Sequence, residues 1–241
     1  MLKEAIEKIS ELAKPTTLEV DGKTYANSSF FEVEPKLHYP ACIELNSLEA
    51  LATMVKTEAV VKYPGEKLYI TIPTYGRAEC FMQPDNDRFH RNTLYLAKMT
   101  DVPGFRDGWW DYETAIIKLR SQFQPNDGTD YILDLLSRIS TEDSAEQKDN
   151  GVSQSVTVRK GVALSGMEKV KPIVKLCPYR TFQELHQPES DFLLRVRDGN
   201  EIGLFEADGG MWKIDARQSI KCYLEMLLKD LIDDGIVVVM L

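Results

Sequence analysis

Residues 204–215 read LFEADGGMWKID, and this stretch decides how the second half of the chain is interpreted. An apolar run typical of a β-strand ends near Glu206 and Asp208, two glycines follow, and a helical pattern begins soon after Trp212. Paired glycines between a strand and a helix are found where backbone N–H groups bind phosphate. The stretch therefore poses a choice between an anion-binding loop and a structural joint before the last helix.

The residues after the glycines favour the structural joint. A phosphate loop places its glycines at the helix N-terminus, whereas here residues 211–214 are predicted to separate them from the helix. Asp215 is expected to be the N-cap, and Gln218 completes a capping box with it. Glu206 and Asp208 would repel a phosphate, and no GKS or GKT sequence follows. We therefore predict a tight Asp-Gly-Gly turn, a short arm with Trp212 and a capped helix.

The closing helix is the clearest element of the sequence. Gly235 ends it, and IVVVML follows as an edge or buried strand. Its apolar stripe consists of Ile220, Tyr223, Leu224, Leu227, Leu228, Leu231 and Ile232. Upstream of this helix, the predicted strands are SVTVRKGV, VKPIVKLC, TFQELH and DFLLRVRDGNEIGLFEA, and the last of them contains an Asp-Gly hairpin.

The start of the chain shows three short elements. A short amphipathic helix ends at Pro15, and TTLEVDGKTYA is typical of a hairpin around its Asp-Gly pair. An extended stretch then leads to ACIEL, after which Asn46 or Ser47 caps a helix.

Residues 67–99 predict a β-meander with the arms LYITIP, RAECFM and NTLYLAKM. Two helices follow, beginning near Asp111 and Thr129, and the short turn QPNDG makes them an αα-hairpin.

Strands cluster, then helices, then strands, then one helix, and this order predicts the fold class. We expect an α+β fold with mainly antiparallel sheet, an αα-hairpin in the middle and a long C-terminal helix. The predicted parts are an N-terminal α+β region over residues 1–139, a mobile polar loop over 140–151 and a β-rich region over 152–241. The two regions alternatively form one continuous domain, and whether they share one sheet stays open.

The chain carries a net charge of −9, which disfavours generic binding to a phosphate backbone. The N-terminus has acids and lysines throughout, and no stretch of about 18 uncharged apolar residues occurs, so we expect no membrane partner and a cytoplasmic location. The four cysteines are far apart and form no CxxC pair. Cys42, Cys80, Cys177 and Cys222 are expected to be buried free thiols, and no metal site is expected.

No nucleophile elbow, HExxH, Walker or dinucleotide motif occurs in the sequence. We therefore assign no catalytic residue and expect no cofactor. A pair of carboxylates of the glycosidase type stays open among 38 acidic residues, as does a metal-dependent hydrolase.

The candidate ligand-binding residues are cations and aromatics in two loops and at one strand end. The loop DNDRFHRN either binds an anion through its arginines or is simply solvated, and the tryptophans of GFRDGWWDYE either stack on a ring or pack in the core or an interface. The strand between the two loops spans roughly 25 Å, so a shared site requires the chain to fold back or a subunit interface. The predicted set is Arg88, His90, Arg91, Arg106, Trp109, Trp110 and Arg159.

The order of elements resembles the YfdQ-like family of phage and prophage proteins. A tryptophan-led helix, WWDYETAIIKLRSQF, precedes a short ILDLLSRI helix, a polar loop, a β-rich segment and a long closing helix. The resemblance covers roughly residues 105–235 and is one of arrangement. It implies a phage gene product expressed in a bacterial cytoplasm, and it implies no chemistry for individual residues.

These observations favour a non-enzymatic phage accessory protein that acts by binding, as a homo-oligomer. It would counteract host defence either by sequestering a small nucleotide-like ligand or by blocking a host protein. The alternative is an accessory factor for phage DNA recombination or replication that binds single strands through aromatics and a basic groove.

Overall fold

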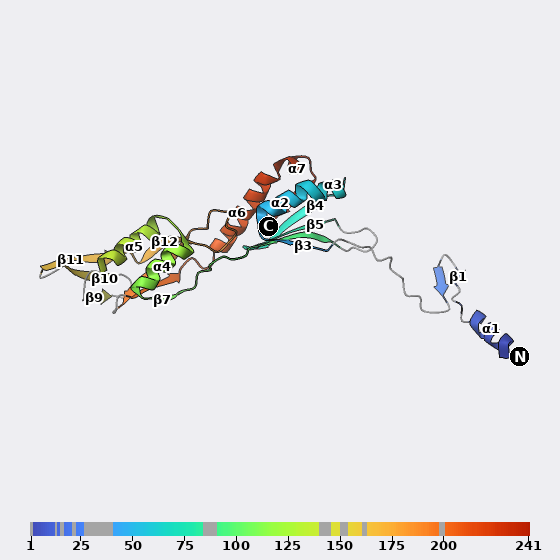
Figure 1. Cartoon of the computed structure of the whole chain (residues 1–241), viewed down its shortest axis with the longest axis horizontal. Helices are drawn as coiled ribbons and strands as arrows, with labels where there is room; N and C mark the ends of the chain where they lie inside the picture. Colours follow the sequence, from blue (N-terminus) through green and yellow to red (C-terminus); the bar gives the residue numbers. More distant parts are fainter. Residues whose placement is uncertain are drawn as a thin grey trace. The chain divides into compact units, whose positions relative to one another are not determined.

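The structure is a computed structural model of the 241-residue chain (Figure 1). It describes residues 2–12, 14, 17–20, 23–26, 41–83, 91–139, 146–149, 154–160, 163–197 and 201–241. The chain divides into two compact units, Met1–Tyr39 and Pro40–Leu241. None of the helices in the described ranges is both long and apolar enough to cross a membrane.

The described residues of the first unit form one helix and one hairpin. Helix α1 (Leu2–Leu12) and the antiparallel strands β1 (Thr17–Val20) and β2 (Lys23–Ala26) confirm the predicted elements, while the Asp-Gly pair between the strands lies outside the described residues. The side chains of Ile6 and Ile9 on α1 are 59% and 66% exposed. Among the described residues of the first unit, no side chain covers these two isoleucines.

The first sheet of the second unit has the strand order β15-β4-β5-β6-β3. Strands β4 (Leu68–Thr74), β5 (Arg77–Met82) and β6 (Thr93–Lys98) pair antiparallel and confirm the predicted meander. The edge strands β3 (Ile43–Leu45) and β15 (Val237–Met240) pair parallel with β6 and β4. Side chains alternate along β4 between the core and the other face, as expected for a sheet covered on one side.

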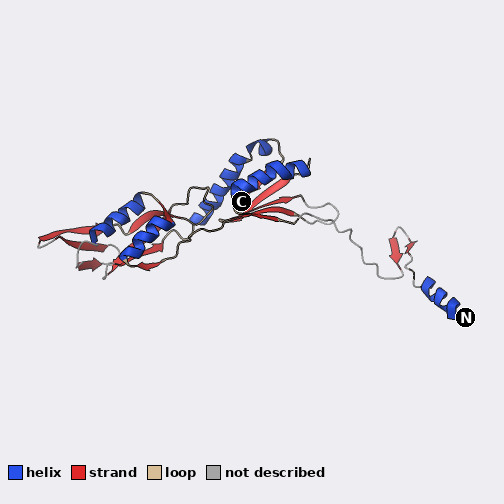
Figure 2. Cartoon of the chain, viewed as in Figure 1, coloured by secondary structure: helices blue, strands red, loops and turns tan. Residues whose placement is uncertain are grey.

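Helices cover one face of this sheet (Figure 2). They are α2 (Leu48–Met54), the π-helical segment η1 (Val55–Ala59), α3 (Val60–Lys62), α6 (Trp212–Leu227) and α7 (Lys229–Asp233). The Ser47 side chain accepts a hydrogen bond from the Ala50 amide and caps α2, as predicted. The closing helix is interrupted at Leu228, where φ is −106° and ψ is 17°. Its apolar stripe packs largely into the core of its own sheet, which removes one reason for expecting an oligomer.

The second sheet has the order β7-β14-β13-β12-β8 and is antiparallel throughout. Its strands are β7 (Gly108–Trp110), β8 (Phe123–Gln124), β12 (Ile173–Pro178), β13 (Ser190–Arg197) and β14 (Glu201–Glu206). The helices α4 (Tyr112–Gln122) and α5 (Asp127–Ile139) pack against one face around Phe123 and Phe192. The turn predicted between these helices begins with β8, so their joint is itself part of the sheet.

A third, three-stranded antiparallel sheet consists of β9 (Glu146–Asp149), β10 (Gln154–Lys160) and β11 (Ala163–Val170). Strand β9 lies within the stretch that we expected to be a mobile loop. The α+β class is confirmed, and the two five-stranded sheets are separate. The strand predicted at TFQELH is wrong, because residues 181–186 form turns.

All four cysteines are free, and only two of them are buried. Burial raises the pKa of the Cys80 thiol to about 12 and also raises the pKa of Cys177. Cys42 and Cys222 are exposed, so the expectation of four buried thiols is wrong. Cys42 directly precedes the short edge strand β3, and Cys222 lies on the solvent side of α6, one helical turn from Gln218.

Candidate functional site

The joint between β14 and α6 is closed by Asp208. Its two carboxylate oxygens accept hydrogen bonds from the backbone amides of Gly210 (2.9 Å) and Trp212 (3.1 Å). Gly209 and Gly210 have φ values of +64° and +83°, which side chains rarely adopt, so the chain can reverse here and enter the helix at once. The N-cap predicted at Asp215 is wrong, because α6 begins at Trp212 and Asp215 already lies in its first turn.

The chain's own carboxylate therefore occupies the helix N-terminus. We expect Asp208→Ala to lower the free energy of unfolding by about 1 kcal/mol, since two amides lose their acceptor. Asp215→Ala, the matched control one turn later, should change it by less than about 0.5 kcal/mol. Urea unfolding of both variants checks this, and an equal loss for the two would restore Asp215 as the capping residue.

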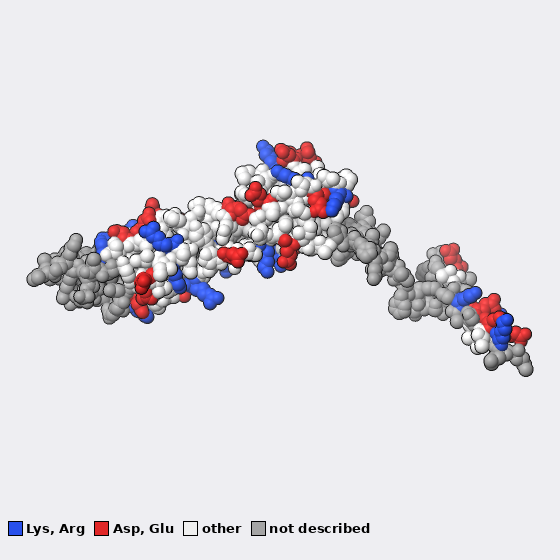
Figure 3. All heavy atoms as spheres, in the orientation of Figure 1, with Lys and Arg blue, Asp and Glu red and all other residues white. Residues whose placement is uncertain are grey.

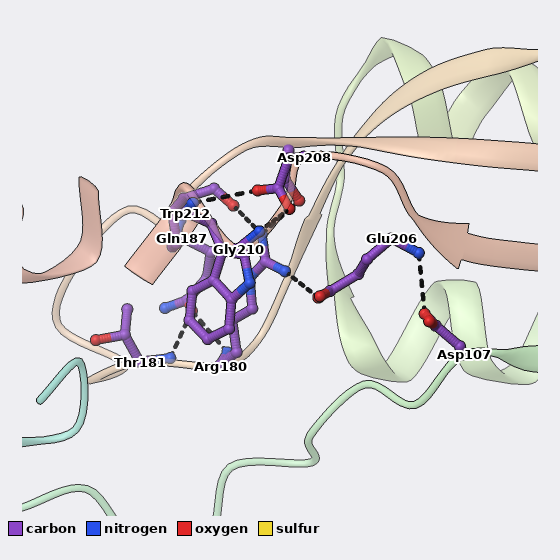
Figure 4. Close-up of polar contacts among 10 residues, drawn as sticks. Asp107, Arg180, Thr181, Gln187, Glu206, Asp208, Gly210 and Trp212 are labelled. Carbon is purple, nitrogen blue, oxygen red and sulfur yellow. Dashed lines mark hydrogen bonds and ion pairs between the residues drawn. The ribbon is translucent and has the colours of Figure 1, made fainter. Parts of the chain in front are cut away.

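A buried arginine, Arg180, lies beside this joint (Figure 4). One terminal nitrogen of its guanidinium donates to a carboxylate oxygen of Glu206 at 2.6 Å. The other donates to the Pro188 carbonyl at 3.2 Å and to the Ser190 hydroxyl. The guanidinium carbon lies 4.0 Å from the centroid of the Trp212 ring, which adds a cation–π contact.

The same network joins the loop between β12 and β13 to the first sheet. The Thr181 hydroxyl donates to the Tyr75 carbonyl, and the Tyr75 ring lies 4.7 Å from the Trp212 ring. The Gln187 side chain is fully buried and makes four hydrogen bonds to backbone groups of this loop. Burial lowers the pKa of Arg180, and the carboxylates of Glu206 and Asp208 oppose that shift. Both terminal nitrogens of the Arg180 guanidinium are bonded to groups of the protein itself, which indicates a structural role.

The structure brings together none of the predicted ligand-binding residues whose side chains it describes. Arg88 and His90 lie outside the described residues, and Arg159 lies in β10 with its side chain likewise outside them. Arg106 is exposed. Arg91 lies over the rings of Tyr69 and Phe81 on the open face of the first sheet, at 6.0 and 5.3 Å.

The two adjacent tryptophans face opposite sides of the second sheet. Trp110 is 7% exposed in the core, where the Phe105 ring meets it edge-on and the Lys118 amine lies 4.4 Å from its ring. Trp109 is 37% exposed on the other face. The prediction that one of them packs in the core is confirmed.

Trp109 belongs to an aromatic and cationic surface on the open face of the second sheet. The Arg197 guanidinium lies 4.5 Å from its ring centroid, and the Phe205 ring meets it edge-on at 5.7 Å. Both rings close over Gly203, where a Cβ atom would lie 2.7 Å from Phe205 and 3.0 Å from Trp109. Only glycine allows the two aromatics to lie this close to the sheet.

The register extends this surface across the strands. Phe205 pairs with Leu193, and Leu193 pairs with Ile173, which is 54% exposed. These side chains alternate with the core residues of their strands, so they share the face with Trp109. We call Trp109, Phe205, Leu193, Ile173 and the flanking Arg197 the open-face surface. Sequence reasoning found only Trp109 of this surface, because the other members became neighbours through strand pairing.

A groove of about 470 Å³ lies at the edge of β12. The first turns of α5, with Gly128 and Tyr131, contribute to one side, and Lys171 and Ile173 contribute to the other. A Cβ atom on Gly128 would lie 2.0 Å from the Lys175 carbonyl oxygen, so helix and strand meet backbone to backbone at one end of the groove.

Acidic and basic side chains are interspersed on the face of the molecule shown in Figure 3. Among the described residues of that face, no continuous basic track follows the strands or helices. The net charge of −9 disfavours generic binding to a nucleic-acid backbone.

The described residues define an α+β protein with two five-stranded sheets, and helices cover one face of each. No known protein family, curated protein or solved structure matches the chain.

Proposed function

We propose that this chain is a non-enzymatic accessory protein that binds another protein through the open-face surface. The observation that carries the proposal is a partly exposed tryptophan on the sheet face opposite α4 and α5, where it contacts Phe205 and lies beside Arg197. The neighbouring row on that face continues from Phe205 to the aliphatic side chains of Leu193 and Ile173. Tryptophan and arginine dominate the binding energy of protein interfaces, where they are surrounded by apolar contacts that exclude water.

A protein partner is favoured over a ring-bearing small molecule by the surroundings of Trp109. Arg197 already lies over its ring, and Phe205 meets it edge-on. A nucleotide base would have to displace Arg197 in order to stack there. Of the two modes of action expected from the sequence, blocking a host protein therefore fits this surface better than sequestering a nucleotide-like signal.

We further propose a phage origin and a location in the bacterial cytoplasm, on the basis of the resemblance to the YfdQ-like family.

We also propose a homo-oligomer, because Ile6 and Ile9 of α1 are exposed. An 11-residue helix is marginal in water when its apolar face is uncovered, so association of α1 between copies would stabilise it.

The proposal predicts that Trp109→Ala weakens partner binding by roughly 30-fold, the loss expected when an interface hot spot of about 2 kcal/mol is removed. Met226→Ala is the matched control, because Met226 is 63% exposed on α6, away from this sheet. Immobilised wild type and variants are exposed to nuclease-treated bacterial lysate, and each captured protein is quantified. Light scattering and thermal unfolding verify assembly and folding.

A protein captured by the wild type and by Met226→Ala, but not by Trp109→Ala, would support the proposal. Capture from a parallel untreated lysate that is absent from the nuclease-treated lysate would instead support the single-strand-binding alternative. If Phe81→Ala abolished partner capture and Trp109→Ala did not, the interface would lie on the open face of the first sheet, where Phe81 contacts Arg91.

A further inference from the structure

The backbone of β12 is open along part of its outer edge. The Leu194 amide donates to the Pro172 carbonyl at 2.9 Å, so residues 172, 174 and 176 form the ladder with β13. In an antiparallel pair the intervening residues turn their amides and carbonyls the other way. The backbone groups of residues 171, 173 and 175 therefore face the groove beside α5.

Side chains of the loop before α5 and of α5 occupy the two ends of this edge. The Asn126 amide donates to the Lys175 carbonyl at 3.0 Å, and the Lys171 amide donates to the Tyr131 hydroxyl at 3.0 Å. Past Lys175 the edge is taken by β8, which pairs with Cys177. Between these ends, the amide and carbonyl of Ile173 face the groove without a partner in the described part of the chain.

Unpaired strand edges bind extended chains by adding a strand, and the main-chain hydrogen bonds provide the affinity. We infer that this groove binds an extended peptide segment, which pairs with β12 at Ile173. The inference rests on the proposed function, a protein partner, and specifies which part of that partner is bound. Strands rise about 3.3 Å per residue, so a segment that spans residues 171–175 has about four or five residues, of which one pairs with Ile173 through main-chain hydrogen bonds.

The charges of the groove specify the peptide further. The Lys175 amine is paired with Glu189 at 3.2 Å. The Lys171 amine lies 4.6 Å from the Tyr131 ring, and no carboxylate within the described ranges pairs with it. The N-terminus of α5 adds a positive partial charge, but Asp127 and Asp130 in its first turn offset it, so the preference for an acidic segment rests on the Lys171 amine. The bound segment therefore carries an aspartate or glutamate beside Lys171.

A second copy of the chain is a poor occupant of this groove. Pairing of β12 with β12 of a second copy would bring the two α5 helices into the same space, so the two edges cannot approach each other. A free segment of a partner has no such obstacle.

The test uses a library of seven-residue peptides with alternating β-branched residues and one fixed aspartate, screened against the full-length chain. Peptides selected by the wild type are expected to slow exchange of the Ile173 amide with deuterium at least tenfold, because that amide becomes a ladder donor. Ile173→Pro removes this donor on the side away from β13, and proline is tolerated at a strand edge. It should weaken peptide binding at least tenfold.

Charge exchange provides a second test that leaves the backbone of the strand unchanged. Lys171→Glu should weaken the aspartate peptides at least tenfold and accept their lysine-substituted versions, whereas Lys229→Glu on α7 should do neither. The inference would be overturned if the wild type enriched no peptides over Ile173→Pro. It would also be overturned if Lys171→Glu bound the aspartate peptides as tightly as the wild type. Protection of Ile173 that depends on protein concentration without peptide would likewise overturn it. Partner capture that needs Trp109 but survives Ile173→Pro would retain the proposed function and remove only this site.

Discussion

Arg180→Ala is expected to lower the free energy of unfolding by about 2–3 kcal/mol, because two buried polar groups lose their hydrogen-bond donor. The guanidinium is 5% exposed and is bonded to Glu206, Pro188 and Ser190. Its loss removes the donor to the Pro188 carbonyl and the Ser190 hydroxyl and uncovers one face of Trp212, whereas Glu206 is 31% exposed and stays hydrated. Chemical unfolding followed by tryptophan fluorescence measures the effect.

Arg197 offers a matched control for this prediction. It also lies over a tryptophan ring and pairs with a glutamate, Glu201, but its side chain is 51% exposed. An exposed ion pair of this kind contributes about 0–1 kcal/mol, so Arg197→Ala should cost no more than that. Similar losses for the two arginines would mean that Arg180 does not stabilise the fold through burial.

Arg180→Lys should rescue little of the loss. A lysine amine cannot reproduce the planar fork that reaches Glu206, Pro188 and Ser190 at once, and it stacks less well on an indole ring. Full recovery by lysine would show that charge alone matters at this position.

Local patterns of the sequence predict much of the fold. The alternation in residues 67–99 predicts the meander β4–β6, and the Asp-Gly turn predicts the hairpin β1–β2, because both patterns depend on neighbours in the chain. The same reasoning places the end of the closing helical region at Gly235, whose φ of +72° ends the last turn.

Geometry that local patterns do not encode explains the errors. The predicted cap at Asp215 is wrong because Asp208 reaches across two left-handed glycines, and the helix therefore begins four residues earlier than the capping box suggests, at residue 212 instead of 216. Glycines at positions 209 and 210 are compatible with positive φ. However, Asp208 and Asp215 both lie close enough to the start of the helix to be its capping residue. Only the geometry of the turn selects between them.

The candidate site is less predictable than the fold for the same reason. Trp109 is visible in the sequence, but Phe205 and Ile173 join it only through the pairing of β7, β14, β13 and β12. The groove depends on the end of β8, which leaves the edge of β12 open before Cys177. No local pattern encodes either arrangement.

The hydrogen bonds of Gln187 explain why residues 181–186 do not form a strand. Substitution of Gln187 is also expected to lower the stability of the fold strongly. The Phe182 and Leu185 side chains both enter the core of the first sheet, a spacing that alternation cannot provide. The Gln187 carbonyl accepts from the Arg180 and Thr181 amides at 2.9 and 3.2 Å. Its amide group donates to the Phe182 and Leu185 carbonyls at 3.1 and 3.2 Å.

We expect Gln187→Leu to lower the free energy of unfolding by about 4 kcal/mol. The substitution preserves the side-chain volume approximately, but it leaves the Arg180 and Thr181 amides and the Leu185 carbonyl without a partner, and each buried unsatisfied group costs about 1–3 kcal/mol before the loop relaxes. The Phe182 carbonyl still accepts from the Leu185 amide at 3.2 Å. Gln183→Leu, at an exposed position of the same loop, is the control and should change stability by less than about 0.5 kcal/mol. Hydrogen exchange at the Thr181 amide should accelerate only in Gln187→Leu. An unchanged Thr181 amide together with a small stability loss would mean that the loop is held by Phe182 and Leu185 packing rather than by this glutamine.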